Sequence, residues 1–212
     1  YEYVQKRLGV DVARFGDDRT VIAPRQGLVA FNTKVMRNAR TTDIAARVST
    51  LYAKWGSEAL IVIDDTGHWG HGVVDQLTVA NIPHLPLVYH AKANHPRYKN
   101  RRAEMYDEFA KWVKRGGKLP NDPELIGELA ALTYTLNNGQ MQIVEKDQLK
   151  KTLGRSPDKA DALAETFCIP DQPRELPGTG GRSNRAKTMD DPHGRQTDRE
   201  RGGRAHTMDD EQ

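Results

Sequence analysis

Short apolar runs near the start of the chain predict three β-strands. The runs lie at residues 8–13 (LGVDVA), 20–24 (TVIAP) and 27–35 (GLVAFNTKV), and each is rich in aliphatic and β-branched side chains. Turn-forming residues separate them at 16–18 and 25–27. Because consecutive strands joined by short turns usually pair with one another, the segment is predicted to form an antiparallel meander.

Helical and strand patterns alternate beyond this meander. Apolar side chains recur with the helical period from Ile44 to Trp55, behind candidate capping residues at 41–43. A continuous apolar run at 59–63 is typical of a central strand covered on both faces. The further predicted elements are a helix from about residue 71, a strand at 85–89, a helix at 101–115 that buries Met105, Phe109, Trp112 and Val113, a helix at 123–132, a strand at 141–145 and a last helix capped by Ser156 with Pro157 at its first position.

This order of elements predicts a mixed α/β fold. A three-strand antiparallel meander followed by alternating helices and strands makes a mixed central sheet flanked by helices. The order is that of the RNase H-like fold, in which the first strand is central and the strand at 59–64 lies beside it. Residues 1–170 are predicted to form this domain. Residues 171–212 lack Ile, Val, Phe, Trp and Tyr, so they are predicted to be a disordered, charged tail rich in Gly, Arg and Asp.

Composition narrows the class of protein. A chain of 212 residues can hold one core of ordinary size and a tail. Its single cysteine, Cys168, excludes an intrachain disulfide framework and a multi-cysteine zinc site, and it favours a reducing cytoplasm. No apolar run approaches the ~20 residues of a membrane span, and the start of the chain is not a signal peptide. Because a strand begins almost at once without an initiator methionine, the chain is expected to be the inside of a longer protein.

Carboxylates stand on or beside three apolar elements. Asp11 lies in the first strand, Asp64 ends the apolar run at 59–63, and Asp158 and Asp161 open the last helix. The two helical aspartates are three positions apart and share one face, with a further acid one turn on. A buried carboxylate is costly unless something pairs with it. The carboxylates are therefore predicted to converge on a shared cation.

The predicted site is a metal centre built from oxygen ligands. Without a cysteine cluster or an obvious histidine triad, carboxylates favour Mg²⁺ or Mn²⁺ over Zn²⁺. Two such ions about 3.5–4 Å apart remove the repulsion between the carboxylates, activate a water and stabilise the leaving 3′ oxygen of a phosphodiester. Asp65 is a weaker alternative ligand. His68 and His71, in the loop that follows, are auxiliary candidates for a metal or a phosphate.

Basic residues gather beside the predicted site. The net charge of +3 is too small to identify a nucleic-acid partner, so the distribution of the charges carries the argument. One group lies around the start of the helix at 101–115, and a second precedes the last helix. Contact with the phosphate backbone supplies most non-specific affinity for DNA. The predicted DNA contacts are Lys99, Arg101, Arg102, Lys150, Lys151 and Arg155.

Several motifs resemble those of a known family. The segments GVDVARFGDDRT, IVIDDTG…GVVDQL, NRRAEMYDEFAKWVKRGG and EKDQLKKTLGRSPDKADALAET look like the nuclease domain of phage large terminase subunits, over about residues 7–168. The DKADALA stretch is also similar to the closing motif of the RuvC Holliday-junction resolvases. By this resemblance Asp11, Asp64 and Asp158 match the three catalytic, metal-binding acids, with Asp161 as an added or alternative ligand.

The resemblance implies an endonuclease that uses two Mg²⁺ or Mn²⁺ ions to cut concatemeric, double-stranded viral DNA during genome packaging. It implies as partners an ATPase domain of the same full-length protein, the small terminase subunit and the portal. The implied location is the host cytoplasm and, transiently, the procapsid portal, outside the mature virion. No GxxxxGK[ST] phosphate loop occurs, so the chain corresponds to the nuclease half without its motor.

Two alternative functions stay open. A junction resolvase would cut four-way junctions in preference to linear or supercoiled duplex. A catalytically silent domain would dock on DNA or on a portal, although retention of all the acids argues against that reading.

Overall fold

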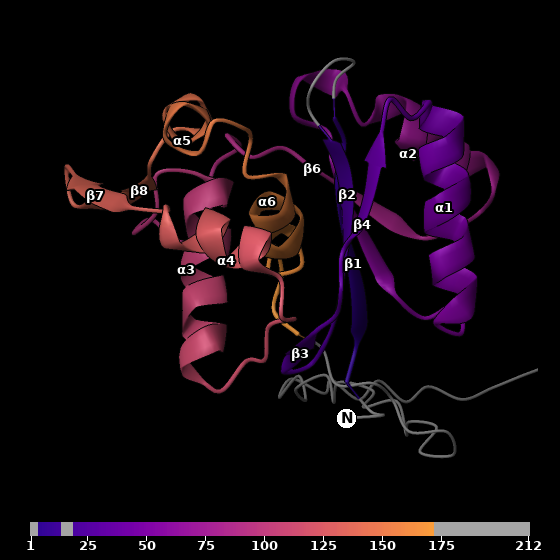
Figure 1. Ribbon diagram of the computed structural model, residues 1–212, viewed down its shortest axis with the longest axis horizontal. Coiled ribbons are helices and arrows are strands. Elements are labelled where there is room, and N and C mark those ends of the chain that lie inside the picture. Colours follow the sequence, from indigo (N-terminus) through magenta and orange to yellow (C-terminus); the bar gives the residue numbers. More distant parts are fainter. Residues whose placement is uncertain (1–3, 14–18, 172–212) are drawn as a thin grey trace, which may run out of the picture. The chain divides into compact units, whose positions relative to one another are not determined.

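The fold is built around a mixed sheet (Figure 1). The computed structural model describes residues 4–13 and 19–171. Within these ranges the sheet has the order β3–β2–β1–β5–β6, and β4 also pairs with β2. The strands are β1 (Lys6–Asp11), β2 (Arg19–Gln26), β3 (Val29–Ala30), β4 (Lys34–Arg37), β5 (Leu60–Asp64) and β6 (His84–Leu87), with a separate hairpin of β7 (Tyr134–Asn137) and β8 (Gln140–Ile143). The helices are α1 (Thr41–Lys54), α2 (His71–Val79), α3 (Arg101–Lys114), α4 (Pro123–Ala130), α5 (Lys146–Leu153) and α6 (Asp158–Glu165), with a 3₁₀ turn η1 (Thr66–His68).

The first strand lies at the centre of the sheet. β1 runs antiparallel to β2, with Lys6 beside Gln26, and parallel to β5, with Val10 beside Ile63. β5 is in turn parallel to β6. The predicted mixed sheet, an antiparallel meander extended by parallel strands, is therefore confirmed.

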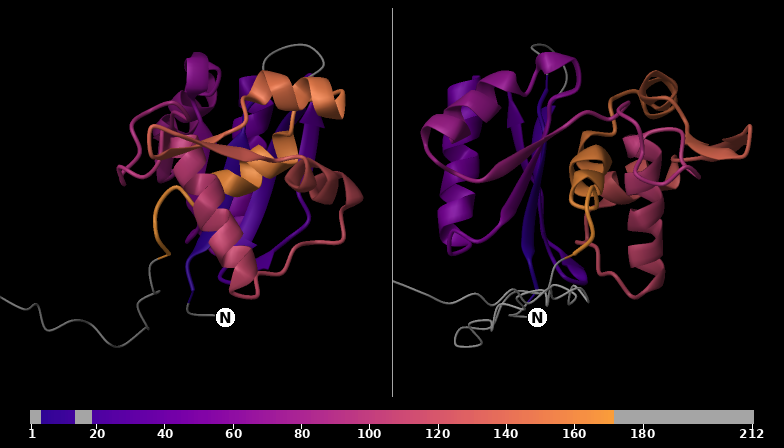
Figure 2. Two further views of the ribbon diagram at one scale, coloured as in Figure 1. Left: turned by 90° about the vertical axis from the view of Figure 1, so that its left-hand side faces the viewer. Right: turned by 180° about the vertical axis from the view of Figure 1, so that it is seen from behind.

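Helices cover both faces of this sheet (Figures 1 and 2). α1 and α2 lie on one face, and α6 lies on the other with α3 packed against it. β5 contributes to both layers, since Ile61 and Ile63 belong to the core beneath α1 and α2, whereas Val62 belongs to the core that α6 and α3 close. The alternation confirms the prediction that the apolar run at 59–63 is buried on both faces.

The third predicted strand is divided in two. β3 and β4 both pair with β2, with Ala30 beside Arg25 and Lys34 beside Ile22. Residues 31–33 therefore oppose only two residues of β2, and the extra residue interrupts the ladder as a β-bulge does. The prediction of one strand over 27–35 is wrong because apolar patterning carries no signal for an inserted residue.

The hydrophobic pattern does not predict β7 and α5, and it places Val113 in the core wrongly. All four residues of β7 are exposed, and α5 buries only Leu149, so neither element has a run of buried apolar residues that marks it in the sequence. Val113 of α3 was predicted to be in the core but is 42% exposed. The buried stripe of that helix passes through Met105, Phe109 and Trp112, and Val113 lies one residue beyond it.

The last helix starts one position later than predicted. Pro157 occupies the N-cap, where Ser156 was expected, and Asp158 is the first helical residue. The cap residue makes no side-chain hydrogen bond. Instead Glu128 of α4 accepts a hydrogen bond of 2.9 Å from the Ala160 N–H. Glu128 is fully buried, and this burial raises its pKa to about 7. A side chain from another helix thus caps the element that carries the predicted acids.

The chain stays attached to the fold as far as residue 171. The Asp171 carboxylate lies 2.7 Å from Nη2 of Arg25 and 3.0 Å from Nε of Arg7, and both arginines are buried. Apart from this residue, the predicted tail at 171–212 lies outside the described residues and its disorder stays a prediction. The predicted turn at 16–18 lies outside them as well. None of the helices in the described ranges has the length and apolar character that a membrane crossing needs.

Candidate metal centre

Two parallel strands bring Asp11 and Asp64 together. Each is the last residue of its strand, and the register that sets Val10 beside Ile63 places the two aspartates at the same edge of the sheet. Asp11 is 3% exposed and Asp64 is 8% exposed. The predicted adjacency of these two carboxylates is therefore confirmed.

Helix α6 supplies a third carboxylate. Glu165 is fully buried, and its ligand oxygen and those of Asp11 and Asp64 lie within 4.8 Å of one another. The helix reaches this position because Gly9 has no side chain, since a Cβ there would lie 1.9 Å from the carbonyl oxygen of Ala162. A glycine in β1 thus lets the helix backbone rest directly on the central strand.

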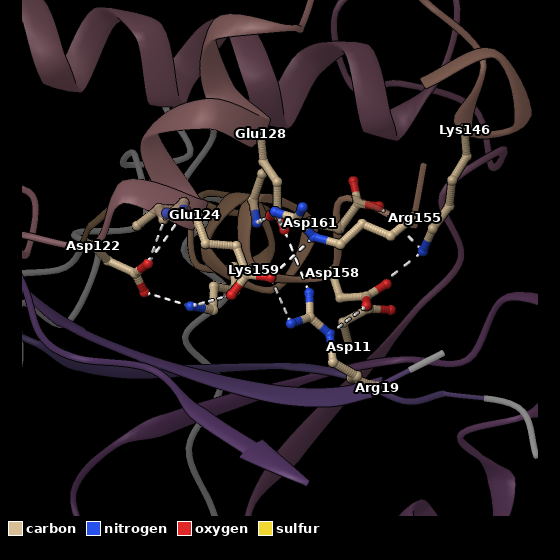
Figure 3. A network of polar contacts seen from close by, with 12 residues as sticks. Asp11, Arg19, Asp122, Glu124, Glu128, Lys146, Arg155, Asp158, Lys159 and Asp161 are labelled. Atoms are coloured by element: carbon tan, nitrogen blue, oxygen red, sulfur yellow. Dashed lines mark hydrogen bonds and ion pairs between the residues drawn. The ribbon is translucent and has the colours of Figure 1, made fainter. Parts of the chain in front are cut away.

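Lys146 lies between Asp161 and the converging carboxylates and contacts both Asp161 and Asp11 (Figure 3). The Nζ atom of Lys146 lies 3.1 Å from Oδ2 of Asp161 and 3.5 Å from Oδ2 of Asp11. Asp161 is fully buried, and its Oδ1 accepts hydrogen bonds from the Tyr106 hydroxyl at 2.6 Å and from Arg102 at 3.3 Å. Lys146, the first residue of α5, therefore supplies a positive charge between carboxylates of β1 and α6.

Asp158 takes part in a different set of contacts. Its Oδ2 accepts a hydrogen bond of 3.3 Å from Nε of Arg19, on β2. Arg19 also lies 2.6 Å from Oε1 of Glu124 and 3.5 Å from Oε1 of Glu128, both on α4 (Figure 3). The other members of this ion-pair network are Asp122, Arg155 and Lys159. Among the described residues, Asp158 is buried within this network, and Glu165 joins Asp11 and Asp64 in the set with converging oxygens.

Burial raises the pKa values of the converging carboxyl groups. Desolvation is the main cause for all three, and it holds the pKa of Asp11 and of Glu165 well above their usual range and raises that of Asp64. Neighbouring carboxylates add to the shift of each group, whereas Lys146 opposes the shift of Asp11 and Asp64. Asp161 behaves differently: desolvation opposes its charge, but Lys146 and Arg102 outweigh it and lower the pKa.

Among the described residues, the Glu165 carboxylate has one oxygen with a hydrogen-bond partner and one buried oxygen without. The Tyr89 hydroxyl donates a 2.9 Å hydrogen bond to Oε1 of Glu165. The buried Oε2 of the same carboxylate has no hydrogen-bond partner among the described residues. Buried polar atoms are rarely left unsatisfied. An unsatisfied oxygen beside two other carboxylates with raised pKa values fits a divalent cation with hard oxygen ligands.

A second group of ligand atoms lies in the loop after β5. Asp65, His68 and His71 each offer one atom, and these atoms lie within 4.8 Å of one another. Nδ1 of His71 is 2.7 Å from Oδ1 of Asp65. The structure therefore directs Asp64 and Asp65, which are adjacent in sequence, into two separate groups.

The predicted DNA-contact residues divide into exposed lysines and arginines that pair with groups of the fold. Lys99, Lys150 and Lys151 are exposed. Arg102 is 7% exposed and donates to the carbonyl of Val144 as well as to Asp161. Arg101 pairs with Glu104, and Arg155 pairs with Glu124 and Glu128. The sequence placed all six together because it shows charge but not whether a side chain turns inward.

Sequence reasoning missed several residues around the acids. Glu165, the further acid one turn beyond Asp161, is not among the predicted ligands. Lys146 belongs to the basic group that precedes the last helix, and the supporting Tyr89 and Tyr106 carry no signal in the sequence. Helical spacing alone could have included Glu165, since positions 158, 161 and 165 share one face.

Together the sheet, the helix across it and the acids at the strand ends define an RNase H-like α/β domain. No family model matches the chain, and no curated protein matches it. Solved structures do.

The chain is similar to the nuclease domain of the large terminase subunit gp2 of bacterial virus Sf6, with a TM-score of 0.61 and 21% identity over 79% of this chain and 89% of that chain. A point mutant of the same Sf6 subunit, solved with calcium, has a TM-score of 0.63 and 21% identity over the same shares of the two chains. The large terminase nuclease from thermophilic phage G20c, with bound magnesium, has a TM-score of 0.57 and 19% identity over 77% of this chain and 80% of that chain. These likenesses show that the chain has the fold of phage terminase nuclease domains, as the sequence resemblance predicts.

Proposed function

We propose that this chain is a metal-dependent endodeoxyribonuclease that cleaves concatemeric, double-stranded viral DNA during genome packaging, as the nuclease half of a large terminase. The observation that carries the proposal is the meeting of Asp11, Asp64 and Glu165 within 4.8 Å, at the edge of a sheet with the terminase nuclease fold. Structures of such domains from other phages were solved with magnesium and with manganese.

The residues divide into ligands and supporting groups. Asp11, Asp64 and Glu165 hold one Mg²⁺ or Mn²⁺ ion, and Asp161 and Asp158, on the same face of α6, are the candidates to complete a second site. When bound, the ions activate a water and stabilise the leaving 3′ oxygen. Lys146 neutralises part of the carboxylate charge, since it lies within 3.5 Å of both Asp11 and Asp161. Tyr89 orients Glu165 through the hydroxyl hydrogen bond to Oε1.

A plasmid-nicking assay tests the proposal. Supercoiled plasmid incubated with the chain and Mn²⁺ is expected to become nicked and then linear, and EDTA is expected to stop the reaction. A four-way junction of the same length as a control duplex belongs in the same experiment. Preferential cutting of the junction would favour a resolvase, and no cutting of any substrate would favour a silent docking domain.

Metal ions are expected to stabilise the fold more at alkaline than at acidic pH. Carboxyl groups with raised pKa values keep their protons to higher pH in the folded than in the unfolded state, so the metal-free protein loses stability as pH rises above the unfolded values near 4. A divalent cation replaces these protons and removes the loss. At ~100-fold excess over its Kd it adds about 2.7 kcal/mol.

Thermal unfolding with Mn²⁺ or EDTA, at about pH 5 and about pH 8, measures this difference. The Mn²⁺-dependent rise in Tm is expected to be clearly larger at the higher pH. An equal rise at both values would mean that the carboxyl groups with raised pKa are not the ligands.

The exposed lysines of α5 are expected to contact the DNA backbone. Lys150 and Lys151 lie on the helix whose first residue, Lys146, contacts Asp11 and Asp161. Replacing both with Ala is expected to weaken duplex binding equally for all sequences and to lower the slope of log K against log salt by about two units. Lys99 is the third exposed candidate.

The proposed function also implies protein partners and a location. The partners are the ATPase domain of the same full-length protein, the small terminase subunit and the portal, and the location is the procapsid in the host cytoplasm.

A matched control comes from the opposite face of the sheet. Arg47 and Lys54 are exposed on α1, and α6 lies across the sheet from them (Figure 2). Fluorescence anisotropy at several salt concentrations compares the two double variants. If Arg47→Ala with Lys54→Ala lowers affinity and slope as much as the α5 variant does, the binding surface is not at α5.

A further inference from the structure

The loop between β5 and α2 gathers a second set of potential metal ligands. It contains the sequence DTGHWGHG, and it places a carboxylate oxygen of Asp65 and one nitrogen from each of His68 and His71 within 4.8 Å of one another. Asp65 is buried, whereas both histidines are exposed. The acid cluster consists of Asp11, Asp64 and Glu165. The loop set differs from it chemically because two of its three ligands are imidazoles.

The backbone of this loop holds the histidines in place. Gly67 has φ of 71° and His68 has φ of 67°, so two consecutive residues adopt the left-handed conformation. A residue with a side chain rarely adopts this conformation unless its surroundings require it. The turn brings the His68 ring against the His71 ring, with centroids 4.7 Å apart and planes at 89°.

The surrounding packing fixes both ends of the loop. The Asp65 N–H donates a 2.8 Å hydrogen bond to the carbonyl of Leu87 on β6. Gly70 lies so close to β5 that a Cβ would sit 2.3 Å from the carbonyl oxygen of Asp64. The first turn of α2, which carries His71, is therefore held beside the end of β5. The three ligands thus lie on a segment that is anchored at both ends.

We propose that Asp65, His68 and His71 form a histidine-containing metal site, distinct from both ion positions of the acid cluster, for a first-row transition ion such as Zn²⁺, Co²⁺ or Ni²⁺. Two imidazoles with one carboxylate suit these ions, whereas Mg²⁺ prefers oxygen ligands alone. Three protein ligands leave coordination positions open. Because the histidines face solvent, a water or a phosphate oxygen can fill them.

An ordinary ion pair explains only part of this geometry. The hydrogen bond and the charge of Asp65 raise the pKa of His71, so a proton competes with a metal for the imidazole. That pair requires nothing of His68. The convergence of a His68 ring nitrogen with the ligand atoms of Asp65 and His71 within 4.8 Å is the feature that a shared metal explains and a simple pair does not.

Zinc titration by calorimetry tests the site with the full chain, without an affinity tag, at mildly alkaline pH. Saturating Mg²⁺ is present so that it competes with Zn²⁺ for the acid cluster. Wild-type protein is expected to bind one equivalent of Zn²⁺. His68→Ala and His71→Ala are each expected to weaken that binding by at least about tenfold, the lower end of the effect of disturbing a metal's ligand environment. Because both side chains are exposed, the variants are expected to fold.

Two control variants separate this site from other binders. His90→Ala removes an exposed histidine outside the cluster, and Asp11→Asn alters the acid cluster; both are expected to keep the tight Zn²⁺ equivalent. The inference is overturned if wild-type protein binds no Zn²⁺ under these conditions, or if His68→Ala and His71→Ala bind it as wild type does. Loss of binding in Asp11→Asn would also overturn it, by assigning the ion to the acid cluster. The readout needs no DNA cleavage, so it stands apart from the test of the nuclease function.

Discussion

Asp11→Asn is expected to abolish metal-dependent cleavage while leaving the fold intact. The substitution keeps the volume of the side chain but removes the charge that a cation requires. Disturbing even the residues that support metal ligands costs ~10–100-fold, so losing a ligand from the centre is expected to lower the rate of plasmid cleavage by at least ~10²-fold. Glu165→Gln is expected to act alike, because its oxygen belongs to the same group within 4.8 Å.

Stability separates this effect from misfolding. Burial raises the pKa of Asp11 well above its usual range, so the charged form is disfavoured in the metal-free protein. Asp11→Asn is therefore expected to match or exceed wild type in metal-free Tm and to lose most of the rise that Mn²⁺ produces. Asp75→Asn is the control, since this carboxylate is exposed on α2. Near wild-type, Mn²⁺-dependent cleavage by Asp11→Asn would sink the assignment of the centre.

Gly9→Ala is expected to destabilise the protein and to disrupt the acid cluster together. The new Cβ would lie 1.9 Å from the carbonyl oxygen of Ala162 and 3.2 Å from Cβ of Glu165, so α6 must move away from β1. Overpacking of this kind typically costs 1–3 kcal/mol, and because the obstacle is backbone we expect about 3 kcal/mol. That corresponds to a fall in Tm of roughly 6–12 °C. Cleavage is expected to fall with it, because Glu165 moves with the helix.

Gly127→Ala provides a control of opposite sign. Gly127 lies within α4, and a Cβ there meets nothing within 4 Å. Alanine is favoured over glycine in a helix by about 1 kcal/mol, so this variant is expected to be more stable than wild type. Chemical denaturation of both variants measures the two changes. A Gly9→Ala protein as stable as wild type would show that α6 does not rest on β1 as closely as the structure has it.

Local patterns were enough to predict the sheet and the two strand-end acids. The apolar run at 59–63 is short and continuous, and it is buried on both faces because helices cover both sides of the central strands. Asp11 lies within the first apolar run and Asp64 directly follows the run at 59–63, so both were found from local pattern, although the structure places Asp11 at the end of its strand and not inside it. Contiguous residues carry this information, so no tertiary contact was needed to find it.

The tertiary structure alone decided which acids of α6 meet the strands. Positions 158, 161 and 165 share a helix face, so the sequence treats them as equivalent. The axial position of the helix depends on the contact between Gly9 and Ala162, which are distant in sequence. That contact brings Glu165 to Asp11 and Asp64, and it leaves Asp158 with Arg19.

The same limit applies to the charged residues around the site. Lys146 and Arg102 read as surface cations, but Lys146 lies between Asp11 and Asp161, and Arg102 is buried against Asp161. Glu128 reads as a helix-surface acid, yet it caps α6 from inside the core. Whether a long charged side chain turns inward depends on partners that folding brings from other elements. Hydrophobic periodicity therefore predicted the sheet and the strand-end acids, whereas the ion pairs that complete the site depended on packing between distant segments.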